Sequence, residues 1–169
     1  MKLVIPAVFA SVILVATSAA PSLGQDAAAQ KNLKRFDTLD FDAYSKQDWK
    51  LFTKLHCADV VVHFPDGRET HGIEQHVHDI KQLFVGTPDS RITSHPIRVG
   101  SKDWTAVTGV MEATFSEPMA LGNGTTQPPN GKKLKLTMAT FARWKGGCIA
   151  EEFLFWDTSA YAAQLGIGR

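Results

Sequence analysis

Large apolar residues recur at helical spacing between residues 33 and 56, which predicts one or two helices there. A polar break at residues 45–47 marks the expected bend, and Asp48 is the expected N-cap of the second helix. A further helix is predicted over residues 73–84, where the apolar positions share one face. A short last helix is expected to follow Asp157, its N-cap, and to end at Gly166.

The remaining segments are β-branched or alternate between apolar and polar residues, the pattern of strands. Pro65-Asp66-Gly67 forms a turn between the first two strands. Pro96 lies inside the third, and proline within a strand indicates an edge or a bulge. A loop rich in Gly, Pro, Asn and Thr separates the fourth strand from the fifth. The strands are expected over residues 59–64, 68–71, 91–100, 104–116, 132–144 and 148–157.

Helices followed by a hairpin, another helix and a strongly paired meander predict an α+β fold. A sheet of this size must curl or be covered. We therefore expect a cone-shaped fold, in which a curled antiparallel sheet packs helices in its concave face around an interior pocket. No repeat or linker divides the chain, so residues 30–169 are expected to form one domain.

The first residues have the layout of a secretory signal. Lys2 precedes an apolar run from residue 3 to residue 16, and small residues continue to Gly24. The run is short for a membrane span, so a signal peptide over residues 1–24 is favoured over an uncleaved anchor. The expected location is periplasmic or secreted.

The two cysteines, Cys57 and Cys148, are therefore expected to meet an oxidising compartment. One lies just before the first strand and the other opens the last strand. If these strands are parallel neighbours, the two thiols lie at one end of the sheet and can form a disulfide. The alternative is that both are small buried apolar residues.

Charge and composition narrow the class of partner. Eighteen Lys and Arg residues against 17 Asp and Glu give a net charge of +1. This balance gives no electrostatic support for binding nucleic acid or an anionic membrane. The expected partner is a small hydrophobic molecule.

Four motifs follow one another along the chain. They are Asp59–Gly67 with Gly72 opening a helix, Pro88-Asp89-Ser90-Arg91, Pro128-Pro129-Asn130-Gly131-Lys132, and Gly147–Asp157 followed by Gln164-Leu165-Gly166. In this order they resemble the SnoaL-like polyketide cyclase and ester cyclase family, within the nuclear transport factor 2-like superfamily. The resemblance covers residues 36–168.

This resemblance implies the cone-shaped fold, a homodimer or higher homo-oligomer, and cofactor-free acid–base chemistry such as ring closure. The chain departs from the family at two positions. The acid–base aspartate of the cyclases falls at Leu154, and the aspartate base of the related steroid isomerases falls at Phe64. Neither side chain can transfer a proton.

The last strand supplies the first candidate site. If Glu152, Leu154 and Trp156 face the interior, a carboxylate lies among apolar groups and its pKa rises toward the range of a general acid or base. Trp156 offers a flat wall to a planar ligand. The alternative is that Glu152 pairs with Arg143 or another cation.

Three other ionisable residues are candidates. His63, beside Phe64 at the end of the first strand, can relay a proton near neutral pH; otherwise it faces outward. Glu112 is a lone carboxylate on a strand of Val, Thr and Met. A charge on such an apolar face costs free energy unless it is paired with a cation or retained for a function. His95 precedes Pro96, where a bulge can turn it toward a ligand. Phe64 is expected to shape the pocket.

We expect no metal and no cofactor. His71, His76 and His78 lie close together but do not match the i, i+4 zinc pattern, which favours a solvated helix face. A purely structural or oligomeric module is disfavoured by the aromatic residues of the last strand, and two other functions remain open. One is a cofactor-free cyclase, isomerase or lyase using Glu152, His63 and Glu112; the other is an exported protein that binds a small molecule without changing it.

Overall fold

The computed structural model describes residues 26–121 and 124–167, so the predicted signal segment 1–24 lies outside the described residues. No helix in the described part of the chain is both long and apolar enough to span a membrane. The elements along the chain are α1 (Ala27–Asp37), η1 (Thr38–Tyr44), α2 (Trp49–Leu55), β1 (His56–His63), β2 (Glu69–His71), α3 (Ile73–Gln82), β3 (Arg91–Ser94), β4 (Arg98–Ser101), β5 (Trp104–Thr114), β6 (Met119–Ala120), β7 (Thr126–Gln127), β8 (Lys133–Lys145), β9 (Cys148–Phe155) and α4 (Thr158–Leu165).

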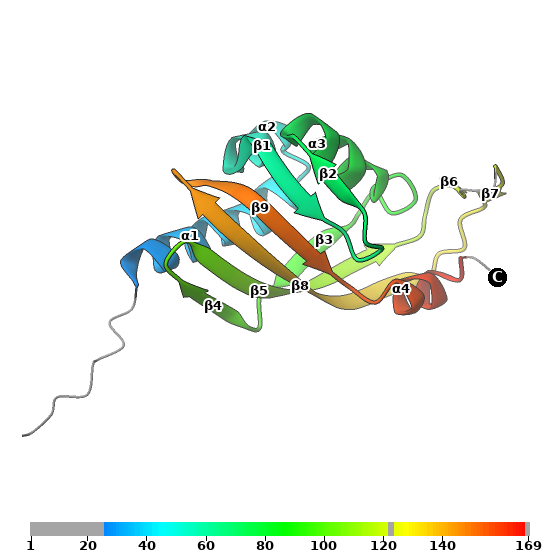
Figure 1. The fold of residues 1–169 in the computed structure, drawn as a ribbon. Coiled ribbons are helices and arrows are strands. Elements are labelled where there is room, and N and C mark those ends of the chain that lie inside the picture. Colours follow the sequence, from blue (N-terminus) through cyan, green and yellow to red (C-terminus); the bar gives the residue numbers. More distant parts are fainter. Residues whose placement is uncertain (1–25, 122–123, 168–169) are drawn as a thin grey trace, which may run out of the picture.

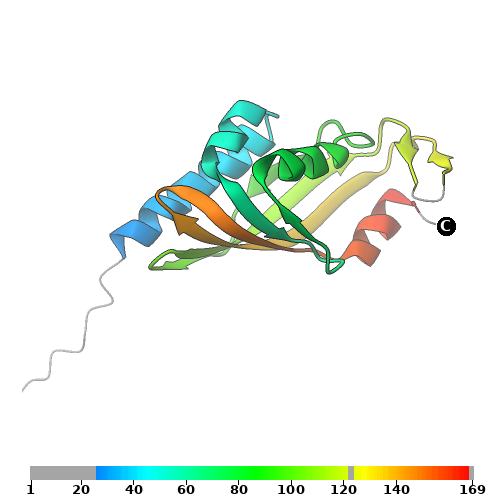
Figure 2. The ribbon, with the colours of Figure 1, turned by 45° about the horizontal axis from the view of Figure 1, so that its top comes forward.

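The α+β class predicted from the sequence is confirmed. Seven strands form one curved sheet in the order β2-β1-β9-β8-β5-β3, with β4 also paired to β5. Helices α1, α2 and α3 lie over one face of this sheet, as Figures 1 and 2 show. The sheet is mixed rather than wholly antiparallel, because β1 and β9 are parallel neighbours.

Alternating side chains on the longest strands separate the two faces of the sheet. On β8, Leu134 and Leu136 are buried under the helices, whereas Lys133 and Lys135 are exposed on the opposite face. Strand β5 pairs with β8 along its whole length and alternates in the same way. These two strands form the floor on which the helices pack.

The third predicted strand is interrupted, as its proline indicated. Residues 91–100 form two short strands, β3 and β4, which flank Pro96 and both pair with β5. The pairing of β3 with β5 shifts register between Ile92 and Ser94. This irregularity turns His95 toward the helices, where it contacts Asp37 and Asp40.

The first helical segment differs from an ordinary pair of α-helices. Helix α1 continues directly into the π-helix η1, in which the backbone N–H of Ser45 donates to the carbonyl of Asp40, five residues earlier. The wider turn places both Leu39 and Tyr44 in the core. Asp48 then caps α2 as predicted, accepting a hydrogen bond from the Leu51 N–H at 2.9 Å.

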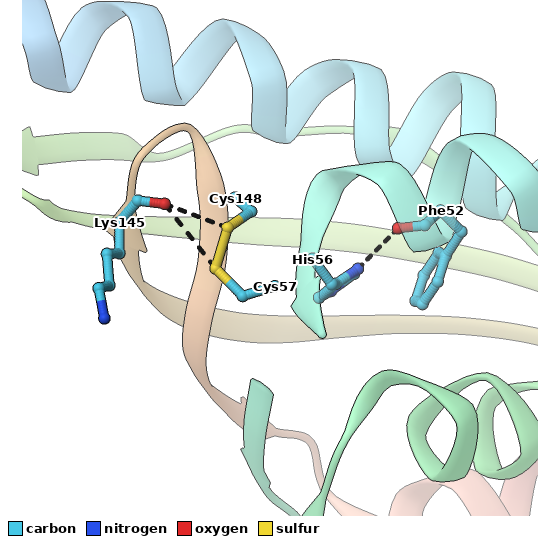
Figure 3. The surroundings of a disulfide bond; sticks show 5 residues. All are labelled: Phe52, His56, Cys57, Lys145 and Cys148. Carbon is cyan, nitrogen blue, oxygen red and sulfur yellow. Dashed lines mark hydrogen bonds between the residues drawn. A yellow bond between two sulfur atoms is a disulfide. The ribbon is translucent and has the colours of Figure 1, made fainter. Parts of the chain in front are cut away.

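The disulfide considered from the sequence is present. Cys57 and Cys148 are bonded, with their Cα atoms 5.0 Å apart. The bond joins the beginnings of the two parallel strands β1 and β9 (Figure 3). It therefore crosslinks the only pair of parallel strands within the described residues.

Candidate functional site

A cavity of about 230 Å³ lies between the helices and the sheet. Its walls come from η1, α2, α3, α4 and the inward face of strands β3, β5, β8 and β9. Most of the lining is aliphatic or aromatic. The lining residues are Leu39, Asp40, Tyr44, Phe52, His76, Ile80, Leu83, Thr87, Ser90, Ile92, Met111, Leu136, Met138, Thr140, Glu152, Leu154, Trp156 and Tyr161.

Asp40 is an acidic group on this apolar wall. The π-helix η1 carries it, and its side chain is only 18% exposed. One carboxylate oxygen, Oδ2, accepts a hydrogen bond at 2.7 Å from Nε2 of His95, whose side chain is 1% exposed. Nδ1 of His95 lies 2.9 Å from Asp37 Oδ1, and Arg98 donates to the second oxygen of Asp37 at 2.6 Å. Asp40 is thus the cavity end of a charged chain running from Asp40 through His95 and Asp37 to Arg98.

Burial raises the pKa of Asp40, and the negative charge of Glu152 adds to this, although the hydrogen bond from His95 opposes it. Burial alone would lower the pKa of His95, but the carboxylates of Asp40 and Asp37 outweigh burial and raise it. A carboxylate with a raised pKa is a stronger base than a free one. The arrangement can take a proton from a molecule in the cavity and hold it.

A second polar cluster lies elsewhere on the cavity wall and is formed by His56, His76 and Glu152. Glu152 on β9 and His76 on α3 both line the cavity. Glu152 Oε2 lies 3.1 Å from His76 Nε2 and 3.7 Å from Nε2 of His56, at the start of β1. Burial alone would raise the pKa of Glu152, but the two imidazoles outweigh it and lower the pKa to about 2. Glu152 is therefore ionised at neutral pH.

The expectation that this part of α3 is a solvated face is wrong for His76. Its residue is 1% exposed, whereas His78 on the same helix is exposed. Because α3 packs against β1, the side of the helix that carries His76 and Ile80 is enclosed. Three residues of separate elements that could hold a metal ion, His56, His76 and Glu152, thus come together.

Hydroxyl groups complete the polar part of the lining. Tyr44 and Ser90 share a hydrogen bond of 2.9 Å, and burial raises the pKa of Tyr44, so that its hydroxyl stays protonated. Burial likewise raises the pKa of Tyr161, on α4, whose hydroxyl contacts Thr87. These groups can orient a carbonyl or hydroxyl oxygen of a ligand.

The structure brings three of the predicted site residues to the cavity. Glu152, Leu154 and Trp156 all lie on its wall, at alternate positions along and just after β9. His95 lies behind the wall and reaches the cavity through Asp40. The pairing of Glu152 with Arg143, considered as an alternative, does not occur; Arg143 instead donates to Glu151 at 2.9 Å.

Two predicted catalytic residues lie on the opposite face of the sheet and do not line the cavity. His63 stacks on Phe153, with ring centroids 4.1 Å apart, and its nitrogens lie 3.1 Å from Glu69 and 3.2 Å from Glu151. The side chains of Val60 and Val62 point inward, so alternation along β1 turns His63 outward.

Glu112 faces outward for the same reason, because Met111 and Ala113 take the inward positions on β5. It pairs with Arg91 at 2.9 Å and Lys135 at 3.3 Å. Phe64 lines a separate hollow, also bounded by Trp156, rather than the main cavity. The sequence-based assignment of these three residues to the pocket therefore does not match their positions.

Sequence reasoning missed Asp40, His56, His76 and the two tyrosines. For Asp40 a signal existed: Phe36 and Phe41 are five residues apart, a spacing that fits a π-turn better than an α-helix. His56 and His76 meet only because α3 folds back over β1, and no local pattern encodes that contact.

Comparison with known families now settles the relationship. The family model for SnoaL-like polyketide cyclase matches residues 35–165, most of the chain.

The chain belongs to the SnoaL-like polyketide cyclase family.

Solved structures agree on the fold. This SnoaL-like protein is similar to a proposed SnoaL-like polyketide cyclase from Jannaschia sp. CCS1, with a TM-score of 0.71, 20% identity, and coverage of 83% of this chain and 94% of that chain. It is also similar to IdmH, a proposed polyketide cyclase from Streptomyces antibioticus, with a TM-score of 0.68, 23% identity, and coverage of 80% and 99%. A protein of ketosteroid isomerase-like fold from Catenulispora acidiphila gives a TM-score of 0.61, 16% identity, and coverage of 80% and 92%.

No curated protein matches the chain significantly. At these identities, the solved structures establish the fold alone. Family and fold together point to small-molecule binding and cyclase-type chemistry for the SnoaL-like protein. Leu154, where the sequence resemblance placed the acid of the cyclases, lies on the cavity wall and is 5% exposed.

Proposed function

We propose that this protein binds a small, largely apolar carbonyl compound in the cavity and moves a proton on it, in a cyclisation, isomerisation or elimination without an organic cofactor. Asp40 is the acid–base group. The observation that carries the proposal is the position of Asp40, a partly buried carboxylate on an apolar cavity wall, hydrogen-bonded to His95 from behind. The chemistry resembles that expected of the family but uses a different residue.

In this reaction Asp40 takes a proton from the carbon next to the carbonyl. The electron pair of the C–H bond forms an enolate, and its negative oxygen accepts hydrogen bonds from wall hydroxyls such as Tyr161. Attack of the enolate carbon on a second carbonyl closes a ring, and the new alkoxide takes the proton back from Asp40. Return of the proton at another carbon instead gives an isomer. Transfer of the proton to a leaving group on the neighbouring carbon, as its bond breaks, completes an elimination. The hydrogen bond from His95 holds the Asp40 carboxylate in place throughout.

The size of the cavity limits the ligand. Pockets for drug-sized ligands measure about 300–1,000 Å³. At about 230 Å³, this cavity fits a smaller molecule with one or two rings. Trp156 and Phe52 offer flat surfaces to such a molecule.

The test uses ketone probes of that size, 2-tetralone and a monocyclic β-ketoester, with hydrogen–deuterium exchange next to the carbonyl followed by NMR. We expect Asp40→Asn to lower the exchange rate by a factor of about 100 or more, the usual contribution of a general base. Glu112→Gln is the matched control, because it neutralises a carboxylate on the outer face of the sheet. Equal rates in wild type and Asp40→Asn would remove Asp40 from the mechanism.

Leu154 supports a second candidate, a binding protein without catalysis. It places an apolar side chain where the resemblance puts the acid of the cyclases, and the cavity keeps room for a ligand. Binding of both probes without any exchange above the solvent rate would favour this function.

We further propose that the protein acts after export. The disulfide between Cys57 and Cys148 supports an oxidising compartment, and residues 1–24 have the composition of a signal peptide. N-terminal sequencing of the protein from its native host, divided into cell fractions, tests both the cleavage and the location.

A further inference from the structure

The cluster of His56, His76 and Glu152 has buried nitrogens that the surrounding protein does not satisfy. His76 Nδ1 has no hydrogen-bond partner among the described residues. Nε2 of His76 and Nε2 of His56 lie 3.1 and 3.7 Å from Glu152 Oε2, without an aligned hydrogen bond. His56, His76 and Glu152 are 4%, 1% and 4% exposed, respectively. A buried polar atom without a partner is costly, so such atoms in a native fold call for a ligand.

The environment fixes which nitrogen of His56 faces the cluster. Its Nδ1 lies 2.9 Å from the carbonyl oxygen of Phe52, which can only accept a hydrogen bond, so Nδ1 carries the proton (Figure 3). Nε2 then presents a lone pair toward Glu152. Histidines that bind metal ions show this arrangement, in which a backbone carbonyl accepts from one nitrogen and the metal binds the other.

The distances fit one ion shared by three ligands. Bonds of about 2.0–2.1 Å at a tetrahedral zinc place neighbouring ligand atoms about 3.4 Å apart. Glu152 Oε2 lies 3.1 Å from His76 Nε2 and 3.7 Å from His56 Nε2, on either side of this value. The ligand atoms of all three residues lie within 4.8 Å of one another.

The three side chains are also held in place before any ion binds. The ring of Phe52 packs against both imidazoles, with centroid distances of 4.5 Å to His56 and 5.2 Å to His76. Glu152 is fixed by the pairing of β9 with β1 on one side and β8 on the other. Metal-binding side chains that are already fixed on rigid elements lose little conformational freedom when the ion binds, which favours a specific site.

We propose that His56, His76 and Glu152 bind one divalent first-row transition-metal ion of the zinc type. Two imidazoles and one carboxylate form a ligand set that Zn²⁺ uses in catalytic sites and that Fe²⁺ uses in oxygenases, in both cases with positions left open. Because His76 and Glu152 line the cavity, the open positions face it, where a ligand oxygen completes the coordination. The proposal does not depend on Asp40 acting as a base.

The test measures binding of metal ions alone to purified protein without a histidine tag, after treatment with EDTA. Titration with Co²⁺, followed by its visible absorption, and competition with Zn²⁺ should give one site per chain. Mg²⁺ and Ca²⁺, which prefer oxygen ligands, should not compete. We expect Glu152→Gln and His76→Ala each to weaken binding by a factor of at least about 100.

Two control variants separate this site from adventitious binding. His78→Ala removes an exposed histidine from the same helix, and His71→Ala removes an exposed histidine beside Glu69 and His63 on the outer face. Both should keep the single site. No binding of Co²⁺ or Zn²⁺ by the wild type, or binding that is lost in His71→Ala and kept in Glu152→Gln, overturns the proposal.

X-ray absorption of the zinc-loaded wild type keeps the test independent of whether the buried variants fold. Two imidazole ligands and the remainder oxygen are expected. A zinc shell with fewer than two imidazoles contradicts the site, whatever the activity of the protein on ketones.

Discussion

At the scale of single residues, His95 gives stability a pH dependence with a definite sign. Its pKa is raised above the ordinary value of 6.5 because Asp37 and Asp40 both contact it. A group whose pKa rises on folding stabilises the protein fully below its unfolded pKa, and this contribution is lost as the pH rises through the folded pKa.

We therefore expect wild type to exceed His95→Gln in free energy of unfolding by the largest margin near pH 6, and by less as the pH rises above 6.5. Urea unfolding from pH 5.5 to 9, in the presence of EDTA, measures the margin. His78→Gln, which changes an exposed histidine, should show no such trend. A margin for His95→Gln that is constant over this range would show that the imidazole is not charged in the fold.

The residues of the site were only partly predictable. Glu152, Leu154 and Trp156 were found because alternation along one strand assigns all three to one face, whichever face that is. His63 and Glu112 were misplaced because alternation alone does not say which face the helices cover. Asp40 faces the cavity because of a π-turn, and the contact of His76 with Glu152 depends on long-range packing.

At the scale of elements, the N-cap residue Asp157 is expected to stabilise helix α4, which forms part of the cavity wall. Asp157 caps this helix, accepting a hydrogen bond from the Ala160 N–H at 2.8 Å, and the helix carries Tyr161 to the cavity wall. Asp157→Ala should lower the free energy of unfolding by about 1 kcal/mol, the usual value of an N-cap. Asp157→Asn, which keeps the accepting oxygen, should change it little. Urea unfolding followed by circular dichroism checks both, and equal losses in the two variants would contradict the capping role.

The second prediction at this scale concerns the stability that the disulfide between β1 and β9 contributes. The disulfide closes a loop with a sequence separation of 91 residues. In the chain-entropy view, such a crosslink stabilises the fold by about 4.6 kcal/mol, because it restricts the unfolded chain. The double variant Cys57→Ala/Cys148→Ala should lose about that much in chemical unfolding. Wild type treated with a reductant should behave like the double variant; unchanged stability in both would contradict this contribution.

Most helices and strands could be predicted from the local sequence, because the turn, capping and alternation patterns agree with one another. The polar break before Asp48, the turn at Gly67 and the alternation on β8 each predict the structure that forms. Pro96 predicted an edge or a bulge, but not the division of the third strand into β3 and β4 or the register shift between Ile92 and Ser94. The π-helix was less accessible, since only the spacing of Phe36 and Phe41 indicated it. The parallel pairing of β1 with β9 could be stated only as the condition for a disulfide, because strand order is a property of the whole fold.

At the scale of the whole molecule, the outer face of the sheet carries aromatic residues on neighbouring strands. Trp104, Phe141 and Phe155 are 39%, 44% and 50% exposed, respectively. The rings of Phe141 and Phe155 pack edge to face, with centroids 5.8 Å apart. An exposed apolar patch of this kind marks an interaction surface, and we predict that a second copy of the chain covers it.

Light scattering after size-exclusion chromatography should give a dimer or larger assembly for wild type. Phe141→Glu/Phe155→Glu should shift it to the monomer, because two charges cannot be buried in an apolar interface. Val85→Glu changes another exposed apolar residue, at 48% exposure, beyond the end of α3 and should leave the assembly intact. A monomeric wild type would contradict the prediction.

The disulfide lies next to His56 in the chain, so it affects the polar cluster as well as the sheet. Cys57 follows His56 directly, so the bond that anchors the start of β1 also anchors one member of the polar cluster at the cavity (Figure 3). Without this bond, the start of β1 is held by its pairing with β9 and by the contacts of His56 with Phe52. Reducing the disulfide therefore removes one anchor of His56 as well as one anchor of β1, so the polar cluster and the fold depend on the same bond.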